Sequence, residues 1–109
     1  MNDKKIIGVD FGATNIRAGI VHGSQLSEIK SKRINSSGSV EEVLKDLFLI
    51  ADPLMDNEVN AIGIGVPSVV DIGKGIVYDV QNIPSWKEVH LKKIMEERYS
   101  VPVLVNNDA

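Results

Sequence analysis

The sequence predicts an α/β fold built on a mixed, five-stranded sheet with helices on its faces. Two short and nearly unbroken apolar runs, at 5–10 and 60–66, have the length and composition of strands that are buried on both sides. Between them, residues 39–51 place apolar side chains at helical spacing. The connections between the first three predicted strands are too short for a crossover, so the sheet should begin with antiparallel pairing.

The first three strands are expected at 5–10, 15–22 and 25–34, as an antiparallel meander. The second strand alternates loosely between apolar and other residues. The third is mostly polar and carries the run Lys30-Ser31-Lys32-Arg33, which suits an edge strand that discourages pairing with another chain.

The helix after these strands should begin at Ser39, a good N-cap, and end near Pro53. Further along the chain we expect a strand at 60–66, a hairpin at 69–80, a helix at 90–99 and a strand at 101–105. His22 and His90 are interpreted as surface or cap residues rather than metal ligands, and Trp86 as a core anchor.

Composition narrows the class of protein. The 109 residues are enough for one small domain, and the 43% apolar and 25% charged fractions are ordinary for a globular protein. A net charge of −3 argues against a general attraction to nucleic acid or to an anionic membrane. The absence of cysteine excludes disulfides and, with no apolar run of about 20 residues, leads us to expect a cytoplasmic protein.

Polar residues follow the predicted buried strands. Asp10 and Asp108 come at or just after two strand ends, and Pro67 ends a third. Ligands of open α/β sheets lie at the carboxyl ends of strands, so these residues are expected to line one cleft.

The turn at 10–15, with sequence Asp-Phe-Gly-Ala-Thr-Asn, has the chemistry of a phosphate site. Gly12 permits close approach of the backbone to a phosphate, and Thr14 and Asn15 add side-chain donors. Asp10 offers oxygen ligands to Mg²⁺. The alternative is an ordinary hairpin turn with the same residue types, which the turn alone does not exclude.

The chain ends on a second candidate, Asn106-Asn107-Asp108. A carboxylate at Asp108 would accept a proton from a hydroxyl nucleophile that Asn107 orients, as phosphoryl transfer requires. The alternative is a polar turn or a frayed end. The two glycines Gly63 and Gly65 permit close approach of a ligand, or serve only packing.

Taken together, these motifs resemble the ROK family of sugar kinases and sugar-responsive repressors. The stretch from Gly8 to Gly19 is similar to the family's first phosphate motif. Residues 63–71, followed by Gly75-Ile76-Val77, Asn82, Trp86 and Leu91, resemble its sugar-side signature, and Pro102-Val103 with Asn107-Asp108-Ala109 its catalytic strand end. The resemblance covers nearly the whole chain.

The resemblance implies an actin-like, ribonuclease H-like fold in which two domains enclose a cleft. Residues 1–109 would be the amino-terminal domain, with the carboxy-terminal domain absent from this chain. The implied activity of the parent protein is ATP-dependent phosphorylation of a hexose or N-acetylhexosamine hydroxyl, with ATP and Mg²⁺ as cofactors. The parent is expected to form a homodimer or higher homo-oligomer, and this chain alone to be inactive or nearly so.

The resemblance also implies roles for individual residues. Asp108 would be the general base, and Asp10 would hold the metal. Facing the ATP phosphates would be Asp10, Gly12, Ala13, Thr14 and Asn15; facing the sugar would be Gly65, Ser68, Val69, Gln81, Asn82, Asn107 and Asp108. The family usually has glycine where Ser68 stands, so a side chain there would narrow the sugar site or add a hydroxyl contact.

Two other functions remain open at this point. A sugar-sensing repressor of the same family would carry a DNA-binding segment ahead of the phosphate motif, whereas few residues precede Ile6, and the motif from Asp10 to Thr14 is intact. The second open function is an interaction domain that derives from a kinase but no longer catalyses a reaction. In either case a domain cut short would expose apolar surface, which predicts self-association or marginal stability.

Overall fold

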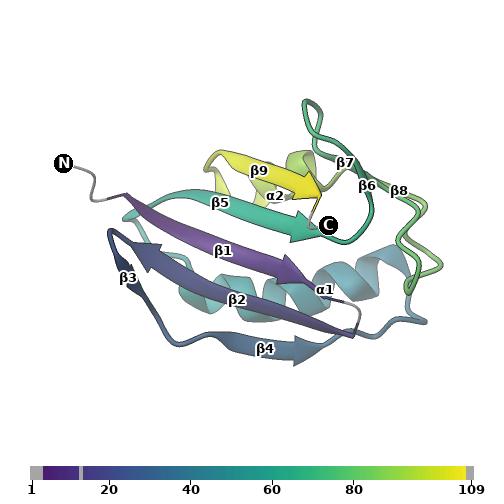
Figure 1. Ribbon diagram of the computed structural model, residues 1–109, viewed down its shortest axis with the longest axis horizontal. Coiled ribbons are helices and arrows are strands. Elements are labelled where there is room, and N and C mark those ends of the chain that lie inside the picture. The colour runs from purple at the N-terminus through teal and green to yellow at the C-terminus, as the bar shows by residue number, and fades with distance from the viewer. Residues whose placement is uncertain (1–3, 13, 108–109) are drawn as a thin grey trace.

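The computed structural model describes residues 4–12 and 14–107. Its main sheet has six strands (Figure 1): β1 Lys5–Phe11, β2 Asn15–His22, β3 Gln25–Leu26, β4 Lys30–Arg33, β5 Val59–Val66 and β9 Val103–Asn107. The order is β3-β2-β1-β5-β9, and β4 also pairs with β2. β1 is antiparallel to β2 and parallel to β5, and β5 is parallel to β9, as a mixed sheet requires.

The sixth strand arises because the predicted third strand is interrupted. Ser27 exchanges two hydrogen bonds with Ile20, since its Oγ accepts from the Ile20 N–H at 2.8 Å and its own N–H donates to the Ile20 oxygen at 2.8 Å. A side chain thus takes the place of the regular backbone ladder. Pairing with β2 stops at Leu26 and resumes at Lys30, and both pieces remain at the sheet edge, as expected.

A second sheet of three strands contains the predicted hairpin. It consists of β6 Val69–Asp71, β7 Ile76–Tyr78 and β8 Glu88–Val89, in the order β6-β7-β8. The hairpin around Gly73-Lys74-Gly75 is therefore confirmed. β8 was not expected, because two residues are too few to display an alternating pattern.

The helices begin and end close to the predicted positions. α1 spans Val40–Ala51 and starts with a capping box, in which Ser39 Oγ accepts from the Glu42 N–H at 3.1 Å and Glu42 Oε1 accepts from the Ser39 N–H at 2.9 Å. It passes into the 3₁₀ helix η1, Asp52–Leu54, at Pro53. α2 spans Leu91–Tyr99, and Ser100 ends it in a left-handed conformation with φ 58°.

The last strand begins two residues later than predicted. Pro102 has no N–H to donate, although its carbonyl oxygen accepts from the Ile62 N–H at 3.0 Å. Regular pairing with β5 therefore runs from Val103 to Asn107, and it includes the two asparagines that were expected to follow the strand.

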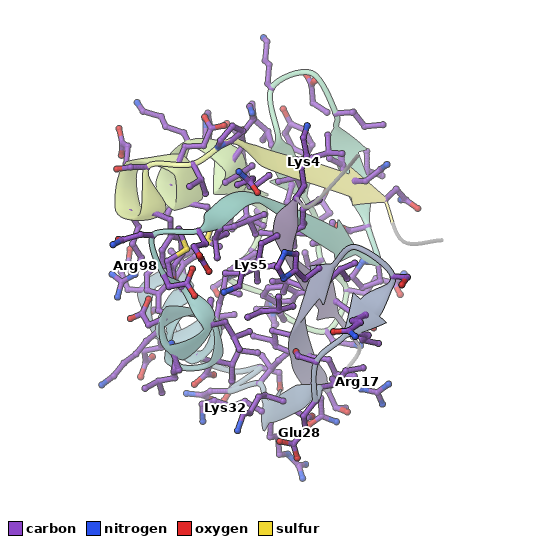
Figure 2. All side chains as sticks on the ribbon, turned by 90° about the vertical axis from the view of Figure 1, so that its left-hand side faces the viewer. Lys4, Lys5, Arg17, Glu28, Lys32 and Arg98 are labelled. Carbon is purple, nitrogen blue, oxygen red and sulfur yellow. The ribbon has the colours of Figure 1, made fainter. Side chains whose placement is uncertain are left out.

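Both helices pack on the same face of the main sheet. The buried side chains of the sheet alternate along each strand and join the two helices in one core, which includes Ile7, Val9, Leu47, Ile62, Ile64, Leu91, Met95, Val103 and Val105. Figure 1 shows α1 behind the sheet, and Figure 2 shows Arg17 projecting on the side away from that helix. Within the described residues, the opposite face of the sheet has no helix over it, and no helix is long and apolar enough to span a membrane.

Candidate active site at the carboxyl edge of the sheet

The polar residues at the strand ends do meet at one edge. Asp10 on β1 is in register with Gly65 on β5, and Gly65 is in register with Asn106 on β9. One position further along, Val66 pairs with Asn107. The parallel strand ends therefore meet at one edge as expected, with Asp10 on β1 and Pro67 directly after β5, whereas Asp108 lies outside the described residues.

The turn from β1 to β2 is closed by short backbone contacts. The Gly12 N–H donates to the Asn15 oxygen at 2.8 Å, and the Ile34 N–H donates to the Thr14 oxygen at 2.8 Å. A Cβ on Gly12 would lie 3.0 Å from the Asn15 oxygen, tighter than ordinary contact, so glycine allows the turn to close. Ala13, also expected to face phosphate, is outside the described part of the chain.

A small hollow of about 170 Å³ opens beside this turn. Its lining residues are Asp10, Gly12, Thr14, Asn15 and Arg17. Within it the Asn15 side-chain amide donates to Thr14 Oγ1 at 3.1 Å, which holds both polar groups at the wall. Every described residue that was predicted to face the ATP phosphates therefore lines this hollow.

Arg17 is the member of the hollow that our prediction missed. It is in register with Asp10 across the antiparallel pair β1 and β2, so both side chains leave the sheet on the same face. The signal was present, because the alternation of β2 places Arg17 opposite the apolar positions and the short turn sets the register. Only the register between the two strands identifies Arg17 as a neighbour of Asp10.

The groups in this hollow fit a phosphate ester and a hard cation. Arg17, the Thr14 hydroxyl and the Asn15 amide are hydrogen-bond donors suited to phosphate oxygens, and the Asp10 carboxylate is an oxygen ligand. Among residues 4–12 and 14–107, no three His, Cys, Asp or Glu side chains gather as a metal site. A magnesium ion here would thus take few protein ligands and complete its shell with phosphate and water, as is usual for that ion.

The turn between β1 and β2 packs on Trp86 through Phe11. The Phe11 and Trp86 rings have centroids 5.2 Å apart at an interplanar angle of 41°, and both side chains are buried. The Val80 N–H donates to the Trp86 oxygen at 3.0 Å, and Ser85 Oγ donates to the Gly38 oxygen at 2.8 Å. Trp86 is a core anchor, as predicted, and fastens the loop that follows β7 beneath the turn.

Four of the predicted sugar-side residues lie at the same edge: Gly65, Ser68, Val69 and Asn107. The side-chain amide of Asn107 donates to the carbonyl oxygen of Ser68, which joins the end of β9 to the loop between β5 and β6. Gly65 lies on β5 close to this contact. Val69 begins β6 and is 68% exposed, so it presents an apolar side chain to solvent next to Ser68.

The hydroxyl of Ser68 was expected to face the sugar site, but it is buried. Its Oγ is buried and has no hydrogen-bond partner in the described structure, although the residue as a whole is partly exposed. The main-chain carbonyl of Ser68, and not its hydroxyl, makes the contact with Asn107.

Gln81 and Asn82 lie in the exposed turn after β7. They are not among the residues that line the hollow at Asp10. The structure therefore brings together the phosphate-side residues, and separately Asn107 with the Ser68 loop.

The ion-pair cluster with the largest pKa shifts lies elsewhere, at the carboxyl ends of α1 and α2. Arg98 donates through Nε and Nη2 to Asp52 at 3.1 and 2.6 Å, and the Tyr99 hydroxyl donates to the same carboxylate. The Arg98 hydrogen bonds lower the pKa of Asp52, whereas burial raises the pKa of Tyr99. Figure 2 labels Arg98 on the side of α1, so this cluster joins helices and takes no part in the candidate site.

Comparison with known proteins supplies the family. The model of the ROK family matches residues 6–109. The glucokinase of Streptomyces coelicolor is 33% identical over 105 residues, which are 94% of this chain and 32% of that protein. The xylose repressor of Bacillus subtilis is 28% identical over 110 residues, which are 94% of this chain and 28% of that protein. This chain therefore spans about a third of the length of such relatives.

A solved structure agrees with the fold. The ROK family glucokinase from Streptomyces griseus, crystallised in complex with glucose and AMPPNP, superposes with a TM-score of 0.78 at 31% identity, covering 96% of this chain and 33% of that one. The expected ribonuclease H-like, actin-like ATPase fold is confirmed. With a family match over all but the first five residues, and with strands, turn and strand ends arranged as that family's motifs require, this chain belongs to the ROK family.

Proposed function

We propose that a longer protein containing this chain is an ATP-dependent sugar kinase, which transfers a phosphoryl group to a hydroxyl of a hexose or N-acetylhexosamine. The observation that carries this proposal is the hollow of Asp10, Thr14, Asn15 and Arg17 at the sheet edge where Asn107 also lies. In this proposal residues 1–109 form the amino-terminal domain of a cytoplasmic, homo-oligomeric enzyme whose second domain lies in the rest of the polypeptide.

The phosphate side uses the β1–β2 turn. ATP with Mg²⁺ supplies the transferred group and neutralises its charge when bound. Asp10 holds the cation directly or through water, and the Thr14 hydroxyl and Asn15 amide donate to phosphate oxygens. Gly12 lets a phosphate approach the backbone of the turn closely, and Arg17 adds a positive charge to the same hollow.

The sugar side uses the end of β9 and the loop after β5. The Ser68 carbonyl orients the amide of Asn107, which then binds a sugar hydroxyl. Asp108 follows directly and accepts the proton of the attacking hydroxyl. Gly65, Ser68 and Val69 form the near wall of the sugar site, and Gln81 and Asn82 reach a more distant substituent.

Phosphoryl transfer depends mainly on positioning and on charge neutralisation. A chain that supplies one wall of the cleft positions neither substrate fully. We therefore expect the 109-residue chain alone to have little or no activity, and the activity to be measured on the longer protein.

The xylose repressor of Bacillus subtilis matches nearly the same part of this chain. A sugar-responsive transcriptional regulator is accordingly the second candidate function. It would use the Asn107 side of the site to bind sugar but would not turn ATP over.

The test is a coupled ADP-release assay on the longer protein, with MgATP and a panel of hexoses and N-acetylhexosamines. Asp108→Asn should lower kcat by about 10²- to 10⁴-fold, the usual contribution of a general base. Asn107→Ala should raise KM for the sugar. Glu97→Ala is the control, because Glu97 is exposed near the carboxyl end of α2 and belongs to neither side of the proposed site, and it should leave KM for the sugar unchanged.

Two results would contradict the kinase. Sugar binding by calorimetry without ADP release would indicate the regulator. Neither binding nor turnover with any sugar in the panel would indicate a domain that has lost catalysis.

A further inference from the structure

The start of β6 presents an apolar side chain to solvent beside the end of β9. Val69 is 68% exposed, the largest exposed fraction of any large apolar side chain in the described structure. Its neighbour Val70 packs against the core, and side chains alternate along a strand, so Val69 points away from the core. A valine that stays in water contributes nothing through hydrophobic burial, so the use of an apolar group here should lie in what covers it.

The loop that precedes Val69 has few polar groups left for a ligand. The Ser68 hydroxyl is buried, the Ser68 carbonyl oxygen accepts from the Asn107 amide, and Pro67 has no N–H to donate. Pro67 and Val69, the two exposed residues that flank Ser68, both carry apolar side chains. This stretch, residues 67–69, is here called the apolar wall.

The apolar wall lies where the proposed function places the sugar. β6 is in contact with β9, and the hydrogen bond from Asn107 to Ser68 holds the start of β6 at the carboxyl end of β9. Asn107 is the residue to which the proposed function gives a sugar hydroxyl. A sugar bound there therefore turns one of its substituents toward Val69.

We propose that this substituent is the acetamido group of an N-acetylhexosamine, with its methyl group against Val69. This rests on the proposed function and narrows its substrate to one of the two classes named there. A hexose hydroxyl against the apolar wall would leave water without gaining a hydrogen-bond partner, which is unfavourable. A methyl group at the same place leaves water for an apolar contact, which is favourable. Both effects favour the N-acetyl sugar.

The size of the preference follows from what an apolar pocket can discriminate. One carbon group more or less in a hydrophobic pocket changes kcat/KM by about 10- to 200-fold. Val69 forms one side of an open wall rather than a closed pocket. We therefore expect a preference at the lower end of that range, about tenfold.

The test compares kcat/KM on the longer protein with MgATP and matched pairs of sugars. The pairs are N-acetylglucosamine with glucose and N-acetylmannosamine with mannose, which differ only in an acetamido group or a hydroxyl at one carbon. In the pair that the protein uses better, the N-acetyl sugar should be preferred about tenfold. Val69→Thr keeps the shape of valine but replaces a methyl group by a hydroxyl, and it should reduce this preference by about fourfold, the value of one buried carbon group.

Ile72→Thr is the matched control. Ile72 is also β-branched and is 53% exposed, but it lies further along the hairpin, past the end of β6 at Asp71, and it has no part in the proposed site. This variant should leave the ratio of kcat/KM values unchanged in both pairs. The free energy of unfolding of each variant, measured in parallel, separates a loss of stability from a loss of discrimination.

Failure of this proposal can be told apart from failure of the kinase. Turnover of hexoses with kcat/KM values equal to or above those of their N-acetyl partners would overturn the substrate class and leave the kinase in place. A preference that Val69→Thr does not reduce would overturn the role of Val69.

If no sugar is turned over, the kinase fails and the dissociation constants of the same four sugars, measured by calorimetry, decide. Tighter binding of the N-acetyl sugar that Val69→Thr weakens would support the apolar wall in a sugar-responsive regulator. Equal binding within each pair, or no binding at all, would overturn the proposal.

Discussion

Gly75, in the β6–β7 hairpin, packs against Lys92 in the first turn of α2 so closely that no side chain fits at this position. Its φ is +66°, in the left-handed region. A Cβ built on it would lie 2.1 Å from Cβ of Lys92, whose own N–H donates to the Gly75 oxygen at 3.1 Å. We therefore predict that Gly75→Ala strongly destabilises the domain.

The magnitude follows from these contacts. A left-handed conformation costs a residue other than glycine about 1 to 2 kcal/mol. An overlap with a Cβ atom, which cannot swing away as the end of a flexible side chain would, adds about 1 to 3 kcal/mol in displaced backbone. Together they predict a loss of about 2 to 5 kcal/mol, a large part of the total stability of a small domain.

Urea unfolding followed by circular dichroism measures this loss. The transition midpoint should fall while the slope stays the same, because the change acts on the native state. Gly73→Ala is the matched control in the same turn. Its Cβ would meet only Asp71 Oδ1, at an ordinary 3.7 Å, so we expect a stability within about 1 kcal/mol of the wild type. Equal stabilities for the two variants would refute the reasoning.

Two further predictions concern a pair of serine hydroxyls, one with and one without a hydrogen-bond partner, and the carboxylate of Asp52. Ser68→Ala removes a buried hydroxyl that has no partner in the described structure, so it should leave the free energy of unfolding unchanged or raise it. Ser85→Ala loses the hydrogen bond to the Gly38 oxygen, so it should lower the free energy of unfolding by about 1 kcal/mol, as measured by thermal unfolding. Destabilisation of similar size by both variants would contradict this prediction. The Arg98 hydrogen bonds hold the pKa of Asp52 below 3.8, so this pair stabilises the fold above about pH 4, and the contribution is lost as the pH falls through the folded pKa. Asp52→Asn should therefore cost about 1 kcal/mol at neutral pH and progressively less as the pH falls below about 4, and a cost independent of pH would exclude the ion pair as its source.

Local features of this chain were readable from the sequence because their causes are local. The cap at Ser39 and the stop at Pro53 depend on groups within a few residues. The apolar runs of β1 and β5 reflect burial on a parallel strand, which the residues themselves record. The family motifs belong to this class as well, since a turn such as 10–15 needs its glycine and its polar residues in a fixed order.

Contacts between residues on neighbouring strands could not be predicted from local sequence patterns. The Ser27 bond to Ile20 divides the third strand, and Pro102 delays the start of β9, although neither effect appears in the alternation of the strands themselves. Arg17 joined the site because strand register places it beside Asp10.

The elements, their order and the family could be predicted from the residues alone, because propensity, capping and turn chemistry act over a few positions. The placement of both helices on one face, and the alignment of Gly8, Gly19 and Gly63 along a hollow on the other, arise only in the folded chain. Those arrangements depend on strand register and crossover direction, which pair residues as far apart in the chain as Ile6 and Ala61, and no local pattern records such pairings.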